Sequence, residues 1–335
     1  MNLASRSMRW IAAGIALPAA LAFNGCSSVQ VKLGIKVPLA SIQASSMEAS
    51  LPKSPAIAPG QKSPLVVTFT TAAGKTWATQ GQGNGKIAWS DLVVTATVVT
   101  VNKKGVVSLA RDPRLSDGKT GHVTVTAPSQ PGLHADLDIP LRYNIAFAAH
   151  FDGSDGTKGM DGTDGLSGSD GSMGSIDANN PSAGGNGSDG GNGTDGSNGS
   201  PGEDASSVQI WLTVQPGPQP LLQAGVLAAG HKERYYLIDP QGGSLTVTAN
   251  GGSGGQGGKG GRGGRGGSGG IGIPPGFSGN NGLDGQDGHS GSDGSGGRIT
   301  VTYDPSAAPY LKILRLSSQD GPKPVMNEAA VAPLW

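Results

Sequence analysis

Glycine falls on every third residue through two long stretches, and this spacing limits the possible folds more than any other feature. Of 335 residues, 59 are glycine, and they crowd into 153–202 and 251–297. Four tracts each hold one phase: 153–174, 184–202, 251–272 and 276–297, which we call tracts 1 to 4. A period of three fits neither an α-helix nor a β-strand. It matches the three residues per turn of a polyproline II helix.

Such a helix has one edge without side chains and no internal hydrogen bonds. Its N–H and C=O groups therefore need partners from outside the helix. We expect the bare glycine edges to let the four tracts bond through their backbones, as a polyproline II bundle within one chain. Each tract would be about 65 Å long at 3.1 Å per residue. The short links 175–183 and 273–275 predict two antiparallel hairpins.

Tract 3 reads Gly-Gly-X, so two of its three edges are bare and we expect it at the centre of the bundle. Its occupied edge carries Lys259, Arg262 and Arg265. The other tracts carry aspartates at Asp155, Asp161, Asp164, Asp170, Asp189, Asp195, Asp204, Asp284, Asp287 and Asp293. Exposed ion pairs contribute only about 0–1 kcal/mol each. We therefore expect this complementary charge to select the register of the tracts more than to stabilise them. Loose Ca²⁺ binding along the acidic edges stays open.

Two other interpretations remain. A flexible glycine-rich linker would not require the constant phase. The glycine period also resembles collagen and would imply a trimeric stalk, although Pro201 is the only proline within the triplets and collagen is rich in proline.

The alternation of tracts with strand-like sequence resembles the glycine-rich domain of the Obg GTPases, and the glycine-rich, collagen-like lipoproteins of environmental bacteria. These resemblances imply an architecture and no GTPase activity.

Period-two alternation flanks the tracts. In 208–214 apolar Val208, Ile210, Leu212 and Val214 alternate with other residues, which is typical of a strand. We expect 206–250 and 298–317 to form a small antiparallel sheet that caps the bundle, giving a domain over 151–317. The tail 318–335 has three prolines and no clear periodicity, so we expect it to be disordered.

The region 26–150 reads as a second, all-β domain. Candidate strands are 29–37, 64–70, 92–101, 122–127 and 133–141, separated by glycine- and proline-containing turns. The string Ile57-Ala58-Pro59-Gly60, followed by Leu65-Val66-Val67-Thr68, resembles the opening of bacterial Ig-like domains. This resemblance implies a β-sandwich. The fold class is therefore mostly β: an Ig-like sandwich followed by a capped glycine-rich bundle.

The first residues read as a targeting signal. Arg6 and Arg9 precede an apolar run from 10 to 23, a length typical of a signal peptide. The only cysteine, Cys26, follows in Phe23-Asn24-Gly25-Cys26. This resembles the lipobox of bacterial lipoproteins and implies cleavage after 25, acylation of Cys26 with palmitate or similar chains, and a membrane anchor. Ser27 favours the outer membrane. Cleavage at Ala20-Leu21-Ala22, which would give a soluble protein, is the alternative.

No pattern of catalytic, cofactor or metal-ligating residues stands out. Matches to G-x-S-x-G arise by chance in a glycine repeat and lack the strand–turn–helix context. The histidines His122, His134, His150, His231 and His289 have no metal-binding spacing. The 24 basic and 24 acidic residues leave no net charge, and no basic patch indicates nucleic acid. We therefore expect a non-catalytic envelope lipoprotein, a spacer or adhesive module with a glycan or protein partner, or else the collagen-like stalk.

Overall fold

The computed structural model describes residues 30–81 and 85–335, and it is mostly β. Contacts divide the chain into two units. Unit 1 contains the residues up to 56, 62–108 and 120–140, and unit 2 contains 57–61, 109–119 and 141–335. Residues 146–150, expected in the N-terminal domain, therefore belong to unit 2.

Unit 1 contains three small sheets with an apolar core. Their strands are β1 (Ala44–Ser50), β3 (Val66–Thr71) and β4 (Thr76–Ala78); β2 (Lys62–Pro64), β7 (Val106–Leu109) and β6 (Val99–Val101); and β5 (Val93–Thr97), β8 (Gly121–Thr126) and β9 (His134–Ile139). The short 3₁₀ helix η1 (Leu39–Ser41) precedes β1, and η3 (Trp89–Asp91) lies between β4 and β5. Val123 and Val125 of β8 are fully buried while the residues between them are not, as the alternation predicted. The expected strand 92–101 is split into β5 and β6 at Val98, whose φ is 68°.

The expected strand at 29–37 is wrong over its described part. Residues 30–32 are helical and residues 33–36 turn back on them. The amide of Gly34 donates to the Val31 carbonyl, and that of Ile35 donates to Gln30. Gly34 has φ 67°, which glycine adopts without strain. Local hydrogen bonds therefore replace a ladder, and only Val37 forms a bridge, to Ile87.

Unit 2 contains two sheets whose buried side chains form one apolar cluster. The five-stranded sheet has the order β13 (Arg234–Ile238), β12 (Leu221–Ala228), β11 (Val208–Gln215), β15 (Ile299–Tyr303) and β17 (Val325–Glu328). The three-stranded sheet has the order β10 (Ala146–His150), β14 (Ser244–Thr248) and β16 (Leu314–Ser317). The 3₁₀ helices η4 (Pro113–Leu115) and η5 (Pro305–Ile313) complete the unit. We call these two sheets the sheet base.

The sheet base is only in part the antiparallel sheet that we expected: β11, β12 and β13 pair antiparallel. Strands β10, β14 and β16 are parallel, and so are β11, β15 and β17. The tracts explain the difference. Strands β10 and β14 both lead into a tract, and β11 and β15 both continue from one. Paired strands that point the same way relative to the tracts must be parallel, and the tracts provide the long connections that parallel strands need.

The expectation of a disordered tail is also wrong. Within 318–335, β17 pairs in parallel with β15 and forms the edge of the five-stranded sheet. The Trp335 ring packs edge-on against Tyr235 at 5.9 Å between centroids, and its indole N–H donates to Asp117. Backbone pairing and this aromatic contact hold a segment that has no internal periodicity.

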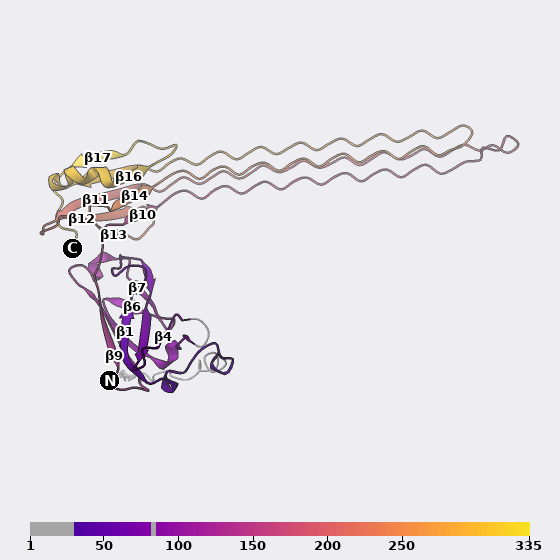
Figure 1. Cartoon of the computed structure of the whole chain (residues 1–335). Coiled ribbons are helices and arrows are strands. Elements are labelled where there is room, and N and C mark those ends of the chain that lie inside the picture. Colours follow the sequence, from indigo (N-terminus) through magenta and orange to yellow (C-terminus); the bar gives the residue numbers. More distant parts are fainter. Residues whose placement is uncertain (1–29, 82–84) are drawn as a thin grey trace, which may run out of the picture. The chain divides into compact units, whose positions relative to one another are not determined.

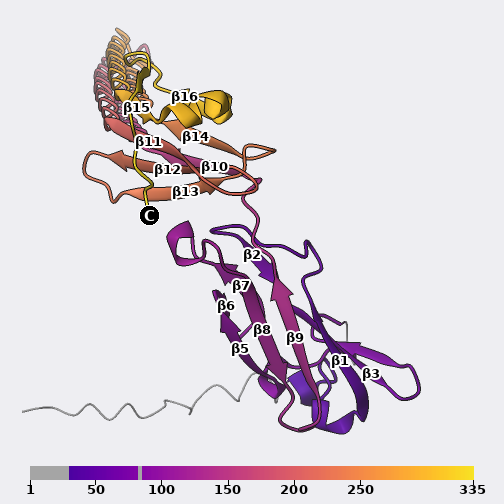
Figure 2. The same cartoon turned by 90° about the vertical axis from the view of Figure 1, so that its left-hand side faces the viewer.

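The four tracts leave the sheet base together as extended segments and turn back at 175–183 and 273–275 (Figure 1). Seen nearly along their length, they lie side by side (Figure 2). Tracts 1 and 2 are antiparallel, and so are tracts 3 and 4, as the short links predicted. Tract 1 is parallel to tract 3, and tract 2 is parallel to tract 4.

The sheet base and the tracts share one register. Ala146 of β10 pairs with Ser244 of β14, and the same separation of 98 residues joins Asp155 to Ser253 and Asp164 to Arg262 in tracts 1 and 3. A separation of 91 residues joins tract 2 to tract 4, as at Asn186 and Phe277, and it equals the offset between β11 and β15. Strand pairing in the sheet base thus continues into the tracts.

Candidate functional site

Backbone hydrogen bonds between tracts recur every third residue. The Gly258 amide of tract 3 donates to the Ser197 carbonyl of tract 2 at 2.9 Å, and the Gly288 amide of tract 4 donates to the Gly258 carbonyl at 2.8 Å. The Gly159 amide of tract 1 donates to Gln256 of tract 3 at 2.8 Å. Because each ladder runs the length of its tracts, the backbone itself holds the four segments together without an apolar core.

In many triplets, a side chain of a neighbouring tract accepts a hydrogen bond from a second backbone amide. Asp164 accepts from the Arg262 amide at 2.7 Å, and Asp284 accepts from the Gly263 amide at 2.6 Å. Asn192 accepts from the Leu283 amide at 2.8 Å, and Thr194 accepts from the Thr163 amide at 2.8 Å. Short acceptor side chains of one tract therefore cap backbone donors of the next, which removes the penalty of unpaired N–H groups.

This capping corrects the expected role of the charges. The aspartates of tract 1 accept from backbone amides of tract 3 rather than from its basic side chains. Within the described chain, Lys259, Arg262 and Arg265 form no ion pair, and the one ion pair among the tracts joins Lys158 to Asp161 at 2.8 Å. That contact, together with the Lys259 amide, lowers the pKa of Asp161. Register therefore depends on amide capping more than on charge pairing.

Close packing explains the doubled glycines of tract 3. A Cβ at Gly258 would overlap the Met160 carbonyl of tract 1, and a Cβ at Gly257 would overlap the Gly288 carbonyl of tract 4. Tract 3 contacts all three other tracts, as its two bare edges predicted. Tract 2 also bonds to three tracts, although the sequence did not indicate it. There, Ser, Thr or Gly fills most of the positions facing tract 1, as at Ser197 and Gly191.

The far end of the tracts exposes apolar side chains. We call residues 173–183 and 271–277 the tip. Ile176, Ile271, Ile273 and Phe277 of the tip are 67%, 59%, 50% and 79% exposed. Exposed apolar groups concentrated at one place are typical of interaction sites. The tip is therefore a candidate contact surface, although the sequence indicated only links and tract ends there.

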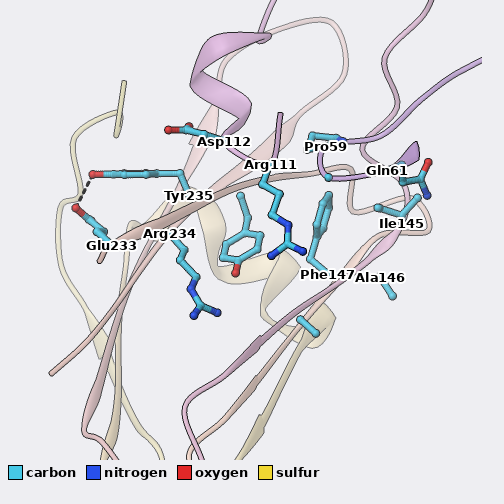
Figure 3. A pocket seen from close by; sticks show the side chains of 13 residues that line it. Pro59, Gln61, Arg111, Asp112, Ile145, Ala146, Phe147, Glu233, Arg234 and Tyr235 are labelled. Carbon is cyan, nitrogen blue, oxygen red and sulfur yellow. Dashed lines mark hydrogen bonds between the residues drawn. The ribbon is translucent and has the colours of Figure 1, made fainter. Parts of the chain in front are cut away.

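A second candidate is a pocket of about 620 Å³ in unit 2, shown in Figure 3. Four separate segments line it: 59–61, 111–112, 145–148 and 233–236. Phe147 packs edge-on against Tyr236 at 5.7 Å between ring centroids. Gln61 is held by the Arg142 guanidinium, which donates to its side-chain oxygen at 3.1 Å. The pocket thus combines an aromatic wall with polar groups.

The charged groups of the pocket differ in their partners. Asp112 pairs with Arg114 at 2.7 Å, and this contact lowers the pKa of Asp112. The Tyr235 hydroxyl donates to Glu233, which raises the pKa of Tyr235. Burial raises the pKa of Tyr236, whereas the nearby positive charges of Arg234 and Arg111 lower it. The Tyr236 hydroxyl therefore stays protonated at neutral pH beside two guanidinium groups.

The predicted lipidation site, Cys26, lies outside the described residues, as does the signal segment. Within 30–81 and 85–335, no group of three or more His, Cys, Asp or Glu side chains is arranged to hold a metal ion. His122 lies on β8, where its Nδ1 is 2.7 Å from Asp138, and this hydrogen bond raises its pKa. None of the helices in the described chain combines the length and apolar character needed to cross a bilayer.

Comparison with known proteins finds no matching family model, curated protein or solved structure. Function must therefore be inferred from the tracts, the tip and the pocket. Sequence reasoning missed the pocket because its residues come from distant segments. The capping side chains did leave a signal, since Asp, Asn, Ser and Thr recur at fixed places in the triplets.

Proposed function

We propose that this chain is a non-catalytic cell-envelope lipoprotein that acts as a spacer and adhesive module. In this proposal Cys26 carries the lipid anchor, unit 1 is an Ig-like sandwich, and the tracts are polyproline II helices bundled into a rod. The observation that carries it is the set of period-three backbone ladders joining four tracts. A repeat of three along every tract is what helices with three residues per turn would produce.

The tip supports an adhesive role. It places exposed Ile271, Ile273 and Phe277 at the end of a rod whose length comes from backbone bonding. The rod would extend about 65 Å from the sheet base at 3.1 Å per residue. A module of this kind holds a contact surface away from its anchor.

The collagen-like stalk receives no comparable support. In a trimer the glycine edges would face other chains, whereas here the glycine amides donate to carbonyls of the same chain, as at Gly162 and Gly261. Light scattering on the purified chain distinguishes the two, because the stalk requires a trimer and the rod is complete in a monomer.

The proposed function is tested by surface attachment of cells that produce the full chain. We expect Phe277→Ser in the tip to weaken attachment. Leu283→Ser is the matched control, because Leu283 is 73% exposed in tract 4 but lies outside the tip. Deleting two facing triplets from all four tracts should shorten the rod by about 19 Å and reduce attachment while the chain stays folded. Equal attachment by all variants would refute adhesion through the tip.

The lipid anchor is tested separately. Cys26→Ser should abolish labelling by a fatty-acid analogue and release the chain from the membrane fraction. A Ser27→Ala variant is the control and should still be labelled. Labelling that persists in Cys26→Ser would contradict the assignment of Cys26.

A further inference from the structure

The pocket of unit 2 contains two arginines that lack an acidic partner. Within the described chain, no carboxylate lies within 4.0 Å of the guanidinium nitrogens of Arg111 or Arg234. The two lining acids have other partners, Arg114 for Asp112 and the Tyr235 hydroxyl for Glu233. Figure 3 shows the Glu233 carboxylate turned toward Tyr235 and away from the Arg111 and Arg234 guanidinium groups.

The arginines are held near one another by their surroundings. The Arg234 guanidinium lies over the Phe151 ring, 4.7 Å from its centroid, and Phe151 is buried. The Arg111 side chain packs against Gly60, where any side chain would meet it. Both positive charges act on the Tyr236 hydroxyl, and Figure 3 shows both guanidinium groups in the same pocket. Two like charges in one pocket repel each other, and a bound anion would relieve that repulsion.

The other residues that line the pocket are suited to binding a ring-shaped ligand. The half-buried Tyr236 offers an aromatic surface beside the edge of Phe147, which is 8% exposed; Ile145 and Pro59 add apolar surface, and the Gln61 side chain and Tyr236 hydroxyl offer hydrogen bonds. Sugars stack their C–H faces on aromatic rings, and their hydroxyls bond to amides and phenols. A volume of about 620 Å³ holds one or two such rings, because small-ligand pockets are about 300–1,000 Å³.

We propose that this pocket binds an anionic sugar residue, with its acid group between Arg111 and Arg234 and its ring against Phe147 and Tyr236. The acid group is a carboxylate or a phosphate ester, since arginine binds both in the same forked geometry. The proposal goes beyond the spacer and adhesive role, and it depends on neither the lipid anchor nor the tip.

Isothermal titration calorimetry on the full chain in detergent tests the proposal, with glucuronate, glucose 6-phosphate, neutral glucose and inorganic phosphate as probes. We expect at least one anionic sugar to bind more tightly than both glucose and inorganic phosphate. Whichever of glucuronate and glucose 6-phosphate binds more tightly identifies the acid group as a carboxylate or a phosphate ester. Equal binding of glucose and the anionic sugars, binding of inorganic phosphate alone, or no binding would overturn the proposal.

Variants locate the site. Arg111→Gln and Arg234→Gln should each weaken binding of the anionic sugar by about tenfold or more, because each removes a charge-assisted hydrogen bond. Tyr236→Phe should weaken it less. Arg262→Gln in tract 3 is the matched control, since that arginine is exposed and unpaired within the described chain, and it should bind normally. Thermal unfolding followed by circular dichroism shows whether each variant is folded. If Arg234→Gln proves destabilised, the binding result for Arg111→Gln alone tests the proposal. Unchanged binding in a folded Arg111→Gln protein would place the ligand elsewhere.

Discussion

The sheet base and the tracts of unit 2 are joined end to end and share one register, yet different interactions hold them together. In the sheet base, side chains such as Leu212 and Leu245 are fully buried in an apolar cluster. In the tracts, large apolar side chains such as Leu166 are exposed, and the least exposed groups are glycines, half-buried in most triplets and buried at one position of each pair in tract 3. The comparison shows that backbone pairing can continue from a sheet into segments that bury almost no apolar side chains, provided that the amides are capped.

The difference predicts an asymmetric dependence. The sheet base has its own core and should fold without intact tracts. The tracts take their register from β10, β14, β11 and β15, so they should not stay ordered without the sheet base. Two substitutions test this dependence, and two further changes test how side chains cap the amides of the tracts.

Leu212→Ala should have the largest effect. Leu212 on β11 is fully buried in the apolar cluster, and truncation of a buried leucine costs about 2–5 kcal/mol. We expect the free energy of unfolding to fall by that amount, and amide exchange to speed up in both the sheet base and the tracts. Gln209→Ala, on an exposed position of the same strand, is the control. Tracts that stay protected when the sheet base opens would contradict the dependence.

Gly258→Ala should disrupt the tracts and leave the sheet base folded. The added methyl group would overlap the Met160 carbonyl, and overpacking costs about 1–3 kcal/mol. Amide exchange should accelerate in the tracts around residue 258, while β11 and β12 keep their protection. The neighbouring exposed change Lys259→Ala should have little effect. Equal rates of amide exchange in the tracts of Gly258→Ala and Lys259→Ala would show that close approach of the backbones does not hold the tracts together.

Asp164→Ala should have a smaller effect. It leaves the Arg262 amide without its acceptor, which costs about 1 kcal/mol. Asp164→Asn keeps a side-chain oxygen in place, and Asn192 already fills this role in tract 2. We therefore expect the Asn variant to unfold like the parent chain in urea. A loss of stability in Asp164→Asn equal to that of Asp164→Ala would show that charge, rather than capping, is what matters.

Acidification should have the smallest effect, and in the tracts we expect it to act at Asp161. The contacts of Asp161 with Lys158 and the Lys259 amide lower its pKa below the ordinary 3.8. Its stabilising contribution is therefore complete above pH 3.8 and is lost as the pH falls through the lowered value. Carboxyl NMR titration should show the lowered pKa, and Asp161→Asn should reduce the acid sensitivity of tract 1. An ordinary pKa for Asp161 would remove the basis for this expectation.

Sequence periodicity predicted part of the architecture of unit 2. The alternation at 208–214 predicted β11, and the paired glycines of tract 3 predicted its central place. Strand direction was not predictable, because periodicity fixes which residues are buried but not which strands pair. The contacts of tract 2 were missed because Ser197 and its equivalents do not look like bare edges.

The candidate sites could be predicted from the sequence less well than the fold could. Cys26 remains a prediction from its local motif. The pocket depends on Arg111 and Arg234, which lie far apart in the chain, and no local pattern marks them. The tail was misjudged because Trp335 gains its partners, Asp117 and Tyr235, only through the tertiary fold.

The orientation of the ladders has a mechanical consequence. The hydrogen bonds between tracts lie across the rod, as at Gly258 and Ser197. All four backbones run between the sheet base and the tip (Figure 1), so a pull on the tip along the tracts is carried by these backbones while the ladders hold them side by side. Such an arrangement transmits tension to the sheet base with little lengthening, because the tracts are already extended.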